Sequence, residues 1–192
     1  PDHGTFASPG VTTTLTKVES IKIDSGAGED TVMIHDSAGD DELFARAATS
    51  VQPVSSITVT DYDYHDSAEH PTYVPTYSHS LANFEILTAQ STGGIDTAYF
   101  YDSDGDDELV ARQFETVLTG NGFSFRADDF QFTHGYAIGG GDDRAELYDT
   151  PKNDRFKGNS VYARMFRGAY QRRPKFFETT VAYATAGGTD DA

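Results

Sequence analysis

The chain has 192 residues and a formal net charge of −17, from 31 acidic and 14 basic side chains. This charge disfavours binding of nucleic acid or of an anionic membrane over the whole surface, and it favours binding of cations. Cysteine is absent, which excludes disulfide bonds and thiolate metal sites. The hydrophobic fraction of 37%, with 13 Phe and 11 Tyr, is sufficient for the core of one domain.

One sequence unit recurs along the chain. Residues 94–112 align without a gap on 141–159, which lie 47 residues later, and an earlier copy at 28–46 lies 66 residues before the second. Tandem units of this size bury their apolar faces against their neighbours. We therefore expect a single repeat domain over 1–192, with copies at about 18–83 (carrying an insertion at 47–80), 84–129 and 130–176 and a partial copy at 177–192.

The first copy predicts a short strand followed by an acidic turn. Val32 and Ile34 alternate with Met33 and His35, as on a strand with one apolar face. Carboxylates crowded into one turn suit calcium, which takes six to eight oxygen ligands, although Asp in turns also caps backbone N–H groups. The candidate calcium ligands in the first two copies are Asp36, Asp40, Asp41, Asp102, Asp106 and Asp107.

The insertion contains a second candidate metal site. If a strand continues through this segment, Asp61, Asp63 and His65 lie on one of its faces. Carboxylate and imidazole groups bind zinc and manganese, so a transition metal is chemically possible. The spacing matches no specific metal motif, and a solvated polar loop is the competing interpretation.

The second and third copies predict more short strands, at about 97–103, 108–112, 116–119, 123–126 and 130–138. No segment has the pattern of an amphipathic helix. We predict an all-β protein, built as a parallel β-helix or β-roll-like solenoid with about two coils per unit. An antiparallel sandwich or a blade-like repeat is the alternative.

The segment 152–175 is strongly basic, with eight of the 14 basic residues and one acid, Asp154. Arginine binds carboxylate and sulfate groups through paired hydrogen bonds, and aromatic rings among the cations add flat surfaces. The segment therefore predicts a site for an acidic polysaccharide, or a patch that neutralises acidic neighbours. The candidate ligand-binding residues are Arg155, Lys157, Tyr162, Arg164, Arg167, Tyr170, Arg172, Arg173 and Lys175.

Catalysis on an acidic polysaccharide is the alternative function. Elimination from a uronate needs a cation, a base and an acid, which Lys or Arg, His and Tyr supply. The candidates for such a lyase are His134, Tyr162, Lys157, Arg164 and Arg172. No GxSxG, P-loop, GxGxxG, HExxH or EF-hand sequence occurs.

Two motifs carry a resemblance to a known class of repeats. The sequences YDSxGDD at 101–107 and AYATAGGxD at 182–190, with the pairs Phe84-Glu85 and Phe177-Glu178, are similar to tandem repeats of very large secreted or cell-surface proteins of marine bacteria. The resemblance implies an extracellular repeat module and brings no catalytic residues. The third copy departs from it, because Thr150, Pro151 and Lys152 replace the Ser-x-Gly of the turn.

These observations favour a non-catalytic, calcium-stabilised extracellular module with a structural, adhesive or acidic-glycan-binding role. The sequence shows no signal-peptide core and no apolar run that could span a bilayer, and we interpret it as a mature or excised part of a larger protein. The expected partners are an acidic polysaccharide or neighbouring modules of a surface protein, without nucleic acid or membrane insertion. A β-helix polysaccharide lyase is the alternative.

Overall fold

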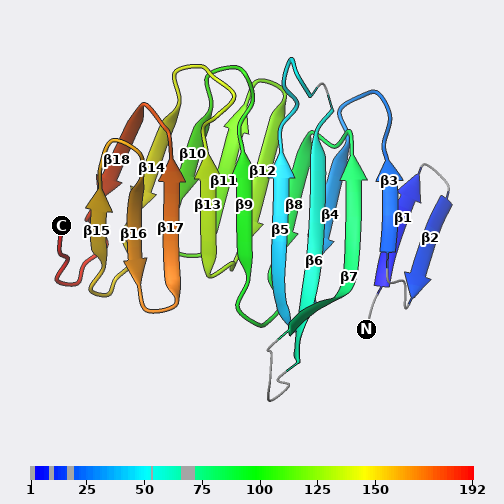
Figure 1. Cartoon of the computed structure of the whole chain (residues 1–192), viewed down its shortest axis with the longest axis horizontal. Coiled ribbons are helices and arrows are strands. Elements are labelled where there is room, and N and C mark those ends of the chain that lie inside the picture. Colours follow the sequence, from blue (N-terminus) through cyan, green and yellow to red (C-terminus); the bar gives the residue numbers. More distant parts are fainter. Residues whose placement is uncertain (1–2, 9–10, 17–19, 53, 66–71) are drawn as a thin grey trace.

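The computed structural model describes residues 3–8, 11–16, 20–52, 54–65 and 72–192. Every regular element in this part of the chain is a β-strand, so the predicted all-β class is confirmed (Figure 1). The strands are β1 (His3–Ser8), β2 (Val11–Thr16), β3 (Ser20–Asp24), β4 (Thr31–His35), β5 (Asp40–Arg46), β6 (Ser56–His65), β7 (Thr72–Ala82), β8 (Ile86–Gln90), β9 (Thr97–Tyr101), β10 (Glu108–Ala111), β11 (Glu115–Gly120), β12 (Phe123–Asp128), β13 (Phe132–Tyr136), β14 (Arg144–Tyr148), β15 (Arg155–Gly158), β16 (Ala163–Arg167), β17 (Tyr170–Lys175) and β18 (Thr179–Tyr183).

Two large sheets lie face to face as two layers (Figure 1). The seven-stranded sheet has the order β18-β14-β10-β11-β12-β8-β4, and the nine-stranded sheet has the order β15-β16-β17-β13-β9-β5-β6-β7-β3. A separate two-stranded sheet contains β1 and β2. Both large sheets mix parallel and antiparallel pairs, because three-stranded antiparallel meanders are flanked by strands that pair in parallel, such as β13 with β9 and β14 with β18.

The chain changes sheet in a regular five-strand pattern. In the unit from β9 to β13, β9 lies in the nine-stranded sheet, β10, β11 and β12 form a meander in the seven-stranded sheet, and β13 returns to the nine-stranded sheet. The units from β4 to β8 and from β14 to β18 follow the same pattern with the two sheets exchanged. Successive units therefore begin in opposite sheets.

Neighbouring units are joined by parallel pairing that follows one rule. The fourth strand of each unit pairs with the fifth strand of the unit before it, as in β7 with β3, β12 with β8 and β17 with β13. The second strand pairs with the first strand of the next unit, as in β5 with β9 and β10 with β14. Each turn between strands is thereby held against the equivalent turn of the next unit.

The core lies between the two sheets and follows the strand alternation that the sequence predicts. Ala98 and Phe100 on β9 are buried, whereas Tyr99 and Tyr101 are half-buried on the other face. The fully buried side chains include Leu43, Leu109, Leu118, Phe125 and Leu147. Side chains that point away from this layer form the two outer faces of the molecule.

Candidate cation and ligand sites

The acidic turns bring three aspartates together at two places. Asp36 follows β4 and Asp41 lies in β5, and both approach Asp96 in front of β9, where the three carboxylates have oxygens within 4.8 Å of one another. Asp102, Asp107 and Asp143 form the equivalent group one unit later, again within 4.8 Å. We call these the first and second aspartate groups; both could hold a metal ion.

Backbone N–H groups determine where these carboxylates lie. In the second group, Asp107 accepts hydrogen bonds from the N–H and hydroxyl of Ser103, both at 2.9 Å, and the N–H of Asp107 donates to Asp143 at 2.9 Å. Asp102 accepts the N–H of Gly139 at 2.9 Å. These bonds cap the turns, as the Asx interpretation of the sequence expects, and they also fix three carboxylates in one small volume.

The same hydrogen bonds recur in the other copies. Asp41 accepts from the N–H of Ser37 at 3.1 Å in the first copy, and Asp154 accepts from the N–H of Thr150 at 2.8 Å in the third. Thr150 thus replaces the serine without loss of the bond, although the Ser-x-Gly sequence is absent there. The backbone of the turn is therefore common to all three copies.

Asp40 and Asp106, two of the predicted calcium ligands, have another role. Both are exposed and accept the N–H of a residue in the next unit, Ile95 at 2.8 Å and Asp142 at 2.9 Å respectively. They lie outside the two aspartate groups. The third members, Asp96 and Asp143, were not among the predicted ligands, although the GGID and GGDD sequences that contain them at 93–96 and 140–143 gave a signal.

Burial and mutual repulsion disfavour the ionised form of these carboxylates. Burial, with repulsion from Asp96 and Asp41, raises the pKa of Asp36 to about 7. Burial, with repulsion from Asp102 and Asp107, raises the pKa of Asp143 to about 6. Burial also raises the pKa of Asp96, Asp102 and Asp107. Each group is therefore chemically suited to take up positive charge, either as protons or as a cation.

The third copy contains a cation of its own. In the strand that pairs with the turn aspartate, one position is occupied by Asp61 in the first copy, Gly120 in the second and Arg167 in the third. Nε of Arg167 lies 3.6 Å from Oδ1 of Asp154, which is 2% exposed. A Cβ at Gly120 would overlap Oδ1 of Asp107, so the second copy has no side chain there.

The insertion contributes to the first group through Asp61. Its side chain is buried, and its charge adds to the repulsion that raises the pKa of Asp96. The side chains of Asp63 and His65 lie outside the described residues. The register of β6 with β7 shifts between Asp61 and Tyr62, where Thr76 of β7 is the extra residue.

The basic segment forms the last meander of the nine-stranded sheet, and most of its cations point outward. Lys157 on β15 pairs in register with Arg164 on β16, and Arg173 on β17 pairs with His134 on β13. Arg155 and Lys175 also lie on this outer face, where the guanidinium of Arg164 stacks on Phe166 at 3.9 Å. The cations therefore share one surface.

Stacked aromatic rings continue this surface across the sheet. Phe44, Tyr99 and His134 stack in one row, with ring centroids 4.6 and 5.1 Å apart, and Nε of Arg173 donates to Nδ1 of His134 at 2.8 Å. In the next row Tyr101 and Tyr136 stack at 4.9 Å. Arg46 lies over Tyr101 at 3.6 Å and Lys175 lies 5.4 Å from the centre of the Tyr136 ring, so both ends of this row carry a cation. We call the whole surface the basic aromatic face.

Three of the predicted ligand-binding residues point inward instead. Arg172 is 1% exposed, and its guanidinium donates to the carbonyl oxygens of Arg112, Gln113 and Gln131 at 2.9 to 3.1 Å. Tyr170 is buried beneath it at 4.4 Å, and Arg167 lies on Asp154. Arg172 thus satisfies backbone carbonyls in the interior and presents no surface to a ligand.

The candidate lyase residues are divided between interior and surface. His134 is 6% exposed, and burial together with the charges of Arg173, Lys175 and Arg172 lowers its pKa to about 3. Its Nδ1 already accepts the hydrogen bond from Arg173. Lys157 and Arg164 lie on the outer face, Tyr162 lines a groove at the end of the sheets, and Arg172 is internal. Because of the bond from Arg173, the Nδ1 lone pair of His134 is already used and is not free to accept a substrate proton.

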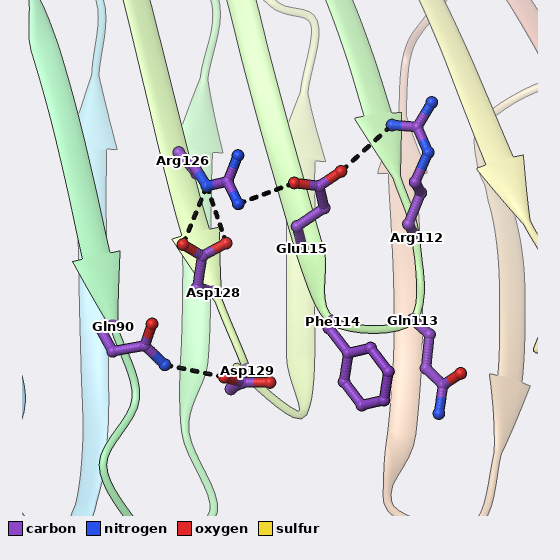
Figure 2. A pocket seen from close by; sticks show the side chains of 8 residues that line it. All are labelled: Gln90, Arg112, Gln113, Phe114, Glu115, Arg126, Asp128 and Asp129. Carbon is purple, nitrogen blue, oxygen red and sulfur yellow. Dashed lines mark hydrogen bonds and ion pairs between the residues drawn. The ribbon is translucent and has the colours of Figure 1, made fainter.

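The outer face of the seven-stranded sheet has a different electrostatic character. A shallow hollow of about 450 Å³ lies beside β8, β11, β12 and the turn that joins β10 to β11, and Figure 2 shows its lining residues. Arg126 bonds Asp128 at 2.8 Å and Glu115 at 2.9 Å, and Glu115 also accepts Arg112 at 3.4 Å (Figure 2). Cations and anions on this face therefore neutralise each other.

Comparison of the chain with models of known protein families, with curated proteins and with solved structures found no match in any of the three. In the part of the chain that the structure describes, no helix has the length and hydrophobicity needed to cross a bilayer.

Proposed function

We propose that this chain is a non-catalytic repeat module of a secreted or cell-surface protein, which binds an acidic polysaccharide on the basic aromatic face. We further propose that the two aspartate groups hold calcium and that the paired sheets form a solenoid of stacked units. The observation that carries the binding proposal is the concentration of cations beside stacked rings on one outer sheet face of a chain with a net charge of −17.

The composition of this face suits an anionic glycan. Two acids lie beside the outward cations: Glu42, which accepts the hydroxyl of Tyr99, and Asp191, which forms an ion pair with Arg155. The outward cations are Arg46, Arg155, Lys157, Arg164, Arg173 and Lys175. Arginine forks bind carboxylate and sulfate groups with two hydrogen bonds, and the faces of Tyr rings pack against sugars. A flat surface also suits an extended polymer better than it suits a small molecule, which needs a concave site.

The contrast between the two outer faces supports the same choice. The cations around the Figure 2 hollow are already paired with Glu115 and Asp128. A ligand there would have to displace these ion pairs. Arg164 and Arg173 have aromatic rings and neutral acceptors as neighbours instead, so their charges remain available to an anion.

The calcium proposal is supported by the chemistry of the donors. The two aspartate groups offer oxygen ligands only, in an irregular arrangement, which calcium tolerates better than magnesium does. The raised pKa values indicate that positive charge is needed when the carboxylates ionise. In the third copy, Arg167 supplies such a charge at the equivalent position.

Polygalacturonate affinity electrophoresis tests the binding proposal. The double variant Arg164→Gln and Arg173→Gln should bind polygalacturonate at least about tenfold more weakly. This loss corresponds to about 1.4 kcal/mol of binding free energy. The matched control, Arg112→Gln with Arg126→Gln, removes two arginines from the other face and should leave retention unchanged. Equal retention by all three proteins would exclude the basic aromatic face as the site. Release of an unsaturated product absorbing in the ultraviolet would favour the lyase alternative.

A further inference from the structure

β18 and β2, at opposite ends of the molecule, each have one edge without a neighbour among the described residues, as do β1, β3 and β4. β18 pairs with β14, and β2 pairs with β1 in the separate hairpin. The two edges lie at the two ends of the long axis of the molecule (Figure 1). Open strand edges carry backbone N–H and C=O groups that can pair with another chain.

β2 corresponds to the fourth strand of a unit. It begins eight residues after β1, and β3 begins nine residues after it, which are the spacings of β11, β12 and β13. β18 is the fifth strand of the last unit. Since fourth strands pair in parallel with fifth strands at three places in this chain, β2 and β18 have complementary positions in the pairing rule.

The backbone groups of β18 are arranged for this pairing. The N–H of Thr179 donates to Asp143 and the carbonyl of Tyr183 accepts from Asp149, so these residues face β14. Alternation along a parallel strand then turns the N–H and C=O groups of Thr180 and Ala182 toward the open edge. In β13, Thr133 and Gly135 occupy the equivalent positions and face β17.

The same end of the molecule has a groove lined by both apolar and polar side chains, the polar ones including Asn159, Glu178 and Thr180. The groove has a volume of about 680 Å³ and is lined by Phe156, Val161, Pro174, Phe176 and Phe177 among others. Val161 and Phe176 are each 47% exposed. Arg155 and Asp191 form a parallel bridge. This bridge is the counterpart of the pair Glu108 with Arg144, where the pairing of β10 with β14 begins one unit earlier. This end therefore has the form of a surface on which a further unit stacks.

The charges of the two ends are complementary. Residues 152–192 have eight basic residues and four acids, whereas residues 1–30, which precede β4, have five acids and two basic residues. Opposite charges steer association and disfavour contacts between two identical ends. A head-to-tail contact is therefore favoured over a symmetric one.

We propose that β18 of one copy of this chain adds β2 of a second copy as a parallel neighbour, which places the acidic end of one molecule on the basic end of the next. The register follows from the internal pairs Phe132 with Gln171 and Ile86 with Ser124, in which the first residue of the fifth strand meets the second residue of the fourth. Thr180 of one copy then pairs with Thr13 of the other. Such a heterologous contact repeats and produces open chains of molecules.

Sedimentation equilibrium of the full chain tests the contact. The weight-average mass should rise from 20.9 kDa to at least twice that value between micromolar and millimolar concentration, and it should rise less in high salt. Ala182→Pro removes an N–H at the open edge and none that bonds β14, and proline is tolerated on edge strands. This variant should remain monomeric, whereas Ala182→Thr, which keeps the N–H, should associate like the parent protein.

Cysteine cross-linking tests the register and does not depend on the proline variant. The chain has no cysteine of its own, so a Thr13→Cys protein mixed with a Thr180→Cys protein should form a disulfide-linked dimer. Val181→Cys is the matched control, because adjacent residues of a strand point to opposite faces, and it should link at least tenfold less. A monomer at millimolar concentration, association that survives Ala182→Pro, or equal linking by the two pairs would each overturn the proposal.

Discussion

The second and third acidic turns have the same backbone and opposite electrostatics. Asp107 and Asp154 are both buried, and both accept an N–H and a hydroxyl from the preceding Ser or Thr. In the second copy Gly120 leaves the carboxylates to repel one another, whereas in the third copy Arg167 lies 3.6 Å from Asp154. The repeat therefore conserves the hydrogen bonds of the turn while it changes the source of positive charge.

This difference shows that the hydrogen bonds that shape the turn and the compensation of its buried charge are two separate requirements. A backbone N–H group donates to the turn carboxylate in each copy, because this bond depends on the path of the chain. The charge of a buried carboxylate is a separate requirement, since burial is costly unless a cation or proton compensates it. An arginine meets the requirement within the chain, and a bound ion would meet it from outside.

The largest expected effect tests what the two turns share. Gly141 and Gly188 have positive φ values of 113° and 90°, and a Cβ on either would overlap the carbonyl oxygen of the preceding turn, at Gly105 or Lys152. Gly141→Ala and Gly188→Ala should each lower the free energy of unfolding by about 4 kcal/mol, measured by urea denaturation. Gly122→Ala, with φ of 82° and open space around it, should cost only about 1–2 kcal/mol. Equal losses at all three positions would contradict the close approach of the turns.

A second variant removes the cation of the third turn. Arg167→Gly leaves Asp154 buried without its partner and should lower the free energy of unfolding by about 3 kcal/mol in chelator. Arg155→Gly controls for the glycine, because Arg155 is exposed and its ion pair with Asp191 is worth little. Added calcium should restore part of the loss for Arg167→Gly only. Identical behaviour of the two variants would show that Arg167 does not neutralise the turn.

Calcium titration compares the turns directly. A site with calcium at 100 times its Kd raises the free energy of unfolding by about 2.7 kcal/mol, and magnesium should do less. Asp107→Asn should abolish the contribution of the second group, whereas Asp154→Asn and the exposed Asp106→Asn should leave the calcium response intact. Thermal unfolding with and without calcium measures these differences. A full response in Asp107→Asn would exclude the second aspartate group as the ion site.

The smallest effect is a dependence on pH in the absence of calcium. The folded pKa of Asp36 is raised from 3.8 to about 7, so between these values the folded state holds more protons than the unfolded state does. Stability should therefore fall as pH rises from 4 to 7, with a similar contribution from Asp143 up to about pH 6. Calcium should flatten the profile, as should Asp36→Asn. A profile that rises with pH over this range would contradict the raised pKa values.

Part of the site could be predicted from local sequence and part could not. The turn contacts of Asp41 and Asp107 follow directly from the repeat, because each carboxylate accepts the N–H of a serine four residues before it. Asp36 and Asp102 instead accept the N–H groups of Thr92 and Gly139 in the next unit. Asp96 joins Asp41 across 55 residues through the hydrogen bond from the N–H of Asp41, at 2.9 Å. That contact depends on the parallel pairing of β5 with β9, which periodicity alone does not reveal.

In the basic segment, too, the sequence predicts only part of the arrangement, as the single strand β17 shows. Alternation predicts that Arg172 and Arg173 point to opposite sides of β17, but it does not say which side is the core. Packing decides this: Tyr170 and Pro174 are buried with Arg172, so Gln171, Arg173 and Lys175 are left on the outer face.

The sequence by itself determined the all-β class, the repeat and the composition of the turns, because these depend on residue alternation and on side chains that bond to nearby backbone. The tertiary structure alone decided which sheet each strand enters, which aspartates meet and which arginines are buried. These features depend on contacts between residues tens of positions apart. Their free energy comes from burying both sheets against each other, and this requires the whole chain to be in place.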